Sequence, residues 1–128
     1  MSSSNIKRLH SNLYFVNDLS ATTKFYKDLG FEVLESDDSI RIKPGDFTLT
    51  FMDELKVQID KEARATPKGI GVFTYVEVND VDAQFNEIKS KSIEPSSEPK
   101  TYPWGKREFA VKDPDGYKIV FYTTIANS

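Results

Sequence analysis

The apolar residues of this chain fall into short runs, typical of strands, and into two stretches with helical spacing. The first series begins with a strand-like run at 13–16, after which Ala21, Phe25 and Leu29 recur every four residues, as on one face of a helix. Gly30 follows and predicts the end of that helix. Alternating apolar residues between turn signals then predict three further strands, at 31–34, 40–43 and 47–52.

A second series repeats this order after a charged connector at residues 54–69. Residues 72–78 predict a strand, and Val81, Phe85 and Ile88 form a second apolar helix stripe. Prolines allow at most a short or edge strand in the next stretch. The remaining strands predicted are that edge strand, at 93–99, and two strands at 108–111 and 117–122.

The two series match residue by residue at their helix starts. Val16-Asn17-Asp18 corresponds to Val78-Asn79-Asp80, and Ala21 corresponds to Ala83 at the same spacing. The shared order of elements indicates a duplication. We therefore predict an α+β fold of two β-α-β-β-β modules, which cover residues 7–53 and 70–124 of one domain.

Composition narrows the classes of protein that fit. The chain has 128 residues, of which 38% are hydrophobic and 29% charged, as in an ordinary globular domain. It has no cysteine, which excludes disulfides and thiolate metal sites and is compatible with a cytoplasmic location. A net charge of -3 argues against nucleic acid as a partner, and no apolar run has the length of a membrane span.

Two sequence patterns resemble those of a known family. Val16-x-Asp18 with Phe25-Tyr26-x-x-Leu29-Gly30-Phe31, and Trp104-Gly105 with Asp113-Pro114-Asp115-Gly116, resemble the two module patterns of the vicinal oxygen chelate superfamily. Its members include glyoxalase I, extradiol dioxygenases and bleomycin-resistance proteins. The resemblance runs from about Leu9 to Tyr122 and implies eight strands curled as a mixed sheet around a cavity. It does not specify an activity, because this fold carries many chemistries.

The resemblance also locates the metal-ligand positions of the metal-dependent members, in which four strands each supply one ligand, usually His or Glu. Those positions here are Ser11, Thr50, Phe73 and Val120. Hydroxyls are weak ligands for a divalent cation, and Phe and Val offer none. The resemblance therefore implies a chain without a metal or another cofactor. His10, the only histidine, is one residue from the first position, so its side chain is expected on the opposite strand face.

The chain is most similar to the metal-free bleomycin-resistance type, whose Trp-Gly lies at the same interval before the Asp-Pro-Asp-Gly turn. Trp104 is expected either to stack over a ligand or to pack against the sheet edge or a partner chain. Strand alternation places further side chains toward the pocket. The expected ligand-binding residues are Phe15, Thr50, Met52, Phe73, Tyr75, Tyr102, Trp104, Arg107, Val120 and Tyr122.

Several pocket-facing side chains have a second interpretation. Leu13, Phe15 and Phe73 are expected mainly to fill the core. Glu77 and Lys118 either pair, orient a ligand or lie at the solvated rim. The opposite strand positions are expected to pack under the helices; these are Leu49, Phe51, Ile119 and Phe121.

We therefore predict a metal-free protein that binds a small organic molecule and sequesters an antibiotic or another aromatic ligand. The alternatives are a metal-dependent lyase, transferase or dioxygenase, a metal-free epimerase-like enzyme with Glu77 or Glu108 as base, and a structural partner domain. Related two-module proteins usually pair their modules across a dimer interface, so the resemblance implies a homodimer with pockets at or near that interface.

Overall fold

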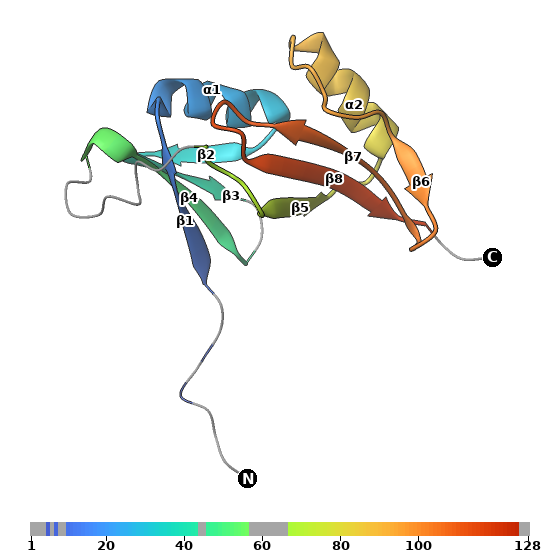
Figure 1. Cartoon of the computed structure of the whole chain (residues 1–128), viewed down its shortest axis with the longest axis horizontal. Helices are drawn as coiled ribbons and strands as arrows, with labels where there is room; N and C mark the ends of the chain where they lie inside the picture. Colours follow the sequence, from blue (N-terminus) through green and yellow to red (C-terminus); the bar gives the residue numbers. More distant parts are fainter. Residues whose placement is uncertain (1–4, 6, 8–9, 44–45, 57–66, 126–128) are drawn as a thin grey trace. The chain divides into compact units, whose positions relative to one another are not determined.

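The computed structural model describes residues 5, 7, 10–43, 46–56 and 67–125 (Figure 1). The chain divides into two compact units, Met1–Arg64 and Ala65–Ser128. The predicted turn at Pro44-Gly45 and most of the connector lie outside the described residues.

The first unit contains one helix and a four-stranded mixed sheet. The strands lie in the order β1-β4-β3-β2, with β1 parallel to β4 and the other pairs antiparallel. A short 3-10 turn, Glu54–Lys56, follows the last strand. The elements are β1 (Ser11–Val16), α1 (Leu19–Leu29), β2 (Glu32–Glu35), β3 (Ser39–Lys43) and β4 (Thr48–Asp53).

The second unit has the same topology. Its sheet has the order β5-β8-β7-β6, and β5 is again the strand that pairs in parallel. This repetition confirms the predicted α+β fold of two β-α-β-β-β modules, with the eight strands in two open four-stranded sheets. The elements are β5 (Phe73–Glu77), α2 (Val81–Ser90), β6 (Lys100–Tyr102), β7 (Lys106–Lys112) and β8 (Lys118–Thr124).

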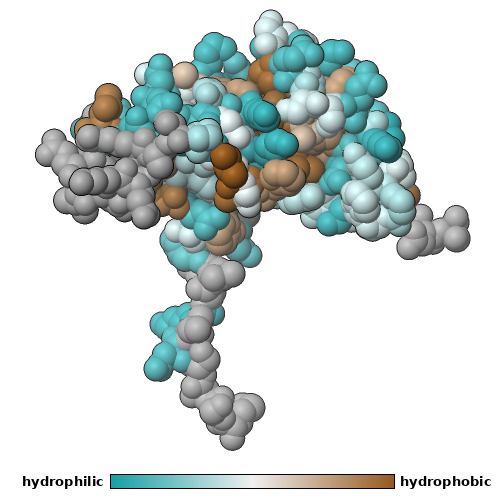
Figure 2. Space-filling model, viewed as in Figure 1, coloured by the Kyte–Doolittle hydropathy of each residue, from teal (hydrophilic) through white to brown (hydrophobic). Residues whose placement is uncertain are grey.

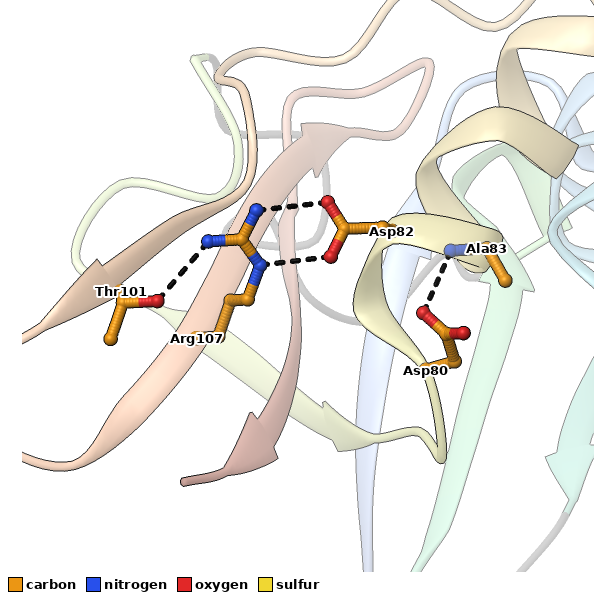
Figure 3. A network of polar contacts seen from close by, with 5 residues as sticks. All are labelled: Asp80, Asp82, Ala83, Thr101 and Arg107. Atoms are coloured by element: carbon orange, nitrogen blue, oxygen red, sulfur yellow. Dashed lines mark hydrogen bonds and ion pairs between the residues drawn. The ribbon is translucent and has the colours of Figure 1, made fainter. Parts of the chain in front are cut away.

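Both helices begin with the same capping contact. Asp18 accepts a hydrogen bond from the backbone N–H of Ala21 at 3.1 Å, and Asp80 accepts one from Ala83 at 3.0 Å (Figure 3). Each carboxylate satisfies a backbone donor that has no partner within the helix. Gly30 ends α1 in the left-handed conformation, with φ of 108°, which a residue with a Cβ adopts at a cost.

The buried stripe of α1 differs from the predicted one. Thr22, Tyr26 and Leu29 are buried, whereas Ala21 and Phe25 are only half-buried. The polar Thr22 is accommodated because its hydroxyl donates to the carbonyl of Asp18 at 3.1 Å. The prediction counted only apolar residues and therefore placed the first two members of the stripe one position too early, whereas Leu29 is buried as predicted.

One face of each sheet packs against the helix of its unit. α1 contacts β2, β3 and β4, and α2 contacts β7 and β8. The ring centroids of Tyr26 and Phe51 are 4.6 Å apart, and those of Phe109 and Phe121 are 5.4 Å apart. Four side chains predicted to lie under the helices are buried, which confirms the alternation; these are Leu49, Phe51, Ile119 and Phe121.

The edge strand of the second sheet lies later than predicted. β6 covers Lys100–Tyr102, and the stretch 93–99 forms no strand. Pro95 and Pro99 lack the N–H groups that a continuous ladder needs. This stretch contacts β7 through single bonds instead, since Ser96 N–H donates to the carbonyl of Ala110 at 2.8 Å.

Candidate functional site

The face of the second sheet opposite α2 carries a row of aromatic side chains. Tyr75 on β5 lies opposite Val120 on β8, and their neighbours in the next row are Glu77 and Tyr122. The rings of Tyr75 and Tyr122 meet edge to face, with centroids 5.9 Å apart. Phe73 lies on the same face at the start of β5. We call this surface the open face of the second unit, and it brings together four of the predicted ligand-binding residues.

The corresponding face of the first unit carries three other predicted site residues. Leu13 lies opposite Thr50, and Phe15 lies opposite Met52, in the parallel pair β1–β4. Phe15, Thr50 and Met52 are half-buried within this unit.

Two residues that were expected mainly to fill the core are instead largely exposed. Leu13 is 49% exposed and Phe73 is 55% exposed. The correction has a simple cause, because the helix of each unit covers only the other face of its sheet. The space-filling view shows hydrophobic residues at the molecular surface among hydrophilic ones (Figure 2). Exposed apolar side chains of this kind mark binding surfaces when they gather on one face.

Lysine side chains lie over the aromatic rings of the open face. The ammonium nitrogen of Lys106 is 4.5 Å from the ring centroid of Tyr122 and 5.5 Å from that of Tyr75. Lys118 lies 4.9 Å from the ring of Phe73 in the same way. These are cation–π distances, so each ring stabilises the lysine ammonium group that lies over it. The sequence patterns did not predict Lys106 as a site residue. Its position two residues before Glu108 on β7 places it on this face.

Trp104 lies in the turn between β6 and β7. Its ring stacks on Tyr102 with centroids 4.4 Å apart and an interplanar angle of 11°. Gly105 closes this three-residue turn with φ of 87°, and its N–H donates to the carbonyl of Tyr102 at 3.1 Å. Trp104 thus packs on the edge strand through Tyr102, but 62% of its surface stays exposed and can contact another molecule.

A hollow of about 370 Å³ lies at one end of the open face, within the range of small-ligand sites. Phe73 and Lys118 from the open face line it, together with Lys112 and the glycines of the loop before β5.

Arg107 is the one predicted site residue on this sheet that lies on the α2 side. Its guanidinium group donates to both carboxylate oxygens of Asp82 at 2.9 Å and to the hydroxyl of Thr101 at 3.1 Å (Figure 3). These hydrogen bonds lower the pKa of Asp82 and raise the pKa of Arg107. These contacts join α2 to β6 and β7. They use the hydrogen-bond donors of Arg107 for contacts inside the protein.

The ion pair predicts a pH dependence of stability. Because the pKa of Asp82 is lowered on folding, its contribution is present above the ordinary value of 3.8 and is lost as the pH falls through the lowered pKa. Wild type is expected to melt at a higher temperature than Asp82→Asn at pH 6, and the difference is expected to vanish in strong acid. Thermal melts between pH 2 and 6 measure it. A difference that stays constant over this range would contradict the assignment.

The four metal-ligand positions of the family do not offer a suitable donor set. Ser11 and Thr50 supply only hydroxyls, and Phe73 and Val120 supply no donor. Within the described ranges, no group of three or more His, Cys, Asp or Glu side chains could hold a metal ion. His10 is exposed, and its Nδ1 lies 3.1 Å from the hydroxyl of Ser11. The residues present therefore do not fit a divalent cation at these positions.

The fold and this surface define a two-module α+β protein with an aromatic sheet face. The family model of the Glyoxalase/Bleomycin resistance protein/Dioxygenase superfamily matches residues 8–121. The chain belongs to this superfamily.

Solved structures show the same fold. A glyoxalase/bleomycin resistance protein/dioxygenase from Nocardioides has a TM-score of 0.80 and 19% identity, over 98% of this chain and 89% of that one. A hypothetical protein from S. aureus has a TM-score of 0.78 and 23% identity, over 94% and 95%. A lactoylglutathione lyase from Agrobacterium tumefaciens has a TM-score of 0.70 and 18% identity, over 94% and 96%.

At these identities the likeness concerns the fold alone. None of the curated proteins matches the chain by sequence. In the part of the chain that the structure describes, neither helix is long and apolar enough to cross a membrane.

Proposed function

We propose that this chain is a metal-free binding protein of the bleomycin-resistance type, which holds a small aromatic molecule such as an antibiotic against the open face of the second unit. The observation that carries the proposal is the set of accessible rings on that face. Tyr75 and Phe73 are exposed on β5, and Trp104 is exposed at the turn after β6, the opposite edge strand of the same sheet.

Physical chemistry favours an aromatic ligand on such a surface. Stacked or edge-to-face rings add about 0.5–1.5 kcal/mol per pair beyond the area they bury. The lysines over Tyr122 and Phe73 add charged groups to this aromatic surface. Small-molecule sites usually combine apolar and aromatic walls with a few polar groups, which this face reproduces.

The dimer in the proposal rests on the family resemblance, whereas the location and the excluded partners rest on composition, charge and hydropathy. We propose a symmetric homodimer with the pocket at or near its interface, in the cytoplasm, with no nucleic acid or membrane as partner. Isologous pairing of identical surfaces is the commonest form of oligomer. Light scattering that shows a monomer at working concentration would count against the dimer.

Thermal melts test the function with a panel of bleomycin and small aromatic probes, each added separately. At least one is expected to raise the melting temperature, because a ligand that binds only the folded state stabilises it by mass action. Trp104→Ala is expected to weaken that ligand about tenfold, which corresponds to about 1.4 kcal/mol.

Nickel and zinc are the control additions. Neither is expected to change the melting temperature, and elemental analysis of the purified protein is expected to find no stoichiometric metal. A bound metal, or the absence of stabilisation by every member of the panel, would contradict the proposal. Thr123→Ala, which removes a small side chain at the α2 side of β8, is the matched control for Trp104→Ala.

A further inference from the structure

Glu108 is a buried carboxylate on the open face of the second unit. It lies in the centre of β7, opposite Tyr122 on β8 and Lys100 on β6. Glu108 is only 8% exposed. Its carboxylate oxygen Oε2 is fully buried and accepts no hydrogen bond from the described residues. Glu108 and Tyr122 face away from α2, because they alternate with the buried Phe109 and Phe121, and Lys100 shares this face because it pairs with Glu108.

The nearby lysines do not pair with this carboxylate. The ammonium group of Lys106 lies over Tyr122 and Tyr75, and that of Lys100 lies 5.3 Å from the ring centroid of Tyr102. Within the described part of the chain, no cation lies within ion-pair distance of Glu108. Burying a charged group without a partner is costly, and a position needed only for packing is better filled by an apolar residue. Glu108 therefore has an acceptor oxygen that a partner from outside the chain can satisfy.

We propose that Glu108 accepts a hydrogen bond from an N–H or O–H group of the bound ligand, whose ring lies against Tyr75 and Tyr122. This inference rests on the proposed function and adds the chemistry of recognition. A charge-assisted bond to a buried carboxylate is among the strongest polar contacts that a ligand can make.

The charged side chains of the open face favour a ligand whose hydrogen-bond donor is uncharged. Four lysines and two glutamates share the strand positions of this face, so a cationic ligand meets net repulsion as it approaches. A phenol or an aromatic amide satisfies Glu108 without adding a positive charge. The six residues that define this charge are Lys100, Lys106, Lys112, Lys118, Glu77 and Glu108.

Removing the carboxylate is expected to stabilise the protein without ligand. Glu108→Gln keeps the shape and removes the charge, and Glu108→Leu removes all polarity. Both variants are expected to raise the melting temperature by about 3 °C or more, because the unpaired charge is no longer buried. The exposed Glu94, changed to Gln, is the control and is expected to shift it by less than about 1 °C. A lower melting temperature in both Glu108 variants would show a structural role and overturn the inference.

Binding of a matched pair of probes tests the hydrogen bond itself. 4-Methylphenol has an O–H donor that its methyl ether replaces by a methyl group, and the dissociation constants of both can be measured by NMR titration. Wild type is expected to prefer the phenol about tenfold or more, and Glu108→Leu is expected to lose this preference while it still binds the ether. 4-Methylbenzylamine, the cationic probe, is expected to bind wild type more weakly than the phenol.

The outcomes separate this inference from the proposed function. A preference for the phenol that persists in Glu108→Leu, or tightest binding of the amine, would overturn the chemistry assigned to Glu108 and leave the aromatic site intact. If wild type bound none of the three probes nor any member of the aromatic panel, the proposed function itself would fail, and this inference with it.

Discussion

Val120→Glu, which places a glutamate at a position that the family resemblance assigns to a metal ligand, is expected to destabilise the protein by about 3–5 kcal/mol and not to create a metal site. Val120 is only 5% exposed. On β8 it lies between its strand partners Tyr75 on β5 and Ala110 on β7. A carboxylate at this position is buried without a designed partner, which is costly. Phe73, the other family position in this unit, has no donor to share a cation with it.

Urea unfolding with and without nickel or zinc measures both parts of this expectation. Val120→Gln has the same shape without the charge, so the difference between the two variants isolates the cost of the carboxylate. A glutamate variant that regains wild-type stability when metal is added would show that a metal site can be assembled here. That result would contradict the metal-free proposal at its central point.

Tyr26→Ala is expected to destabilise the protein by about 3–5 kcal/mol. Tyr26 is fully buried, and its ring packs on Phe51 in β4 and lies within 6.1 Å of the ring of Phe31, measured between centroids. The substitution leaves a cavity between α1 and the first sheet, which the surrounding side chains fill only in part. Urea unfolding followed by circular dichroism gives the free energy.

Phe25→Ala is the matched control for this prediction. Phe25 precedes Tyr26 on the same helix, and the two rings meet edge to face at 5.3 Å, but Phe25 is only half-buried. Its loss is expected to cost about 1–2 kcal/mol. Equal costs for the two variants, or a larger cost for Phe25→Ala, would contradict the shifted stripe described for α1.

Several features follow from local sequence alone, because their physical causes lie within a few residues. Asp18 and Asp80 cap helices whose first turns they directly precede, and Gly30 can adopt the positive φ that ends α1. Strand alternation assigned Phe51 and Phe121 to the helix side correctly, since neighbouring side chains on a strand point to opposite faces. These local signals, together with the family patterns, suffice for the α+β fold of two similar modules.

The roles of individual polar residues were decided only by the tertiary structure. The sequence left Arg107 either beside a ligand or at the surface, and the structure pairs it on the α2 side with Asp82, which lies 25 positions earlier in the chain. Glu108 lacks a partner because the ammonium groups of Lys100 and Lys106 lie over aromatic rings instead.

Sequence by itself therefore determined the modules, the helix ends and the strand faces, all of which depend on residue type and short-range spacing. Tertiary structure decided which polar groups are paired and which apolar ones stay exposed, as Phe73 does. Pairing and exposure depend on distances between strands and helices that are remote in the chain, and a single sequence does not encode those distances in any local pattern.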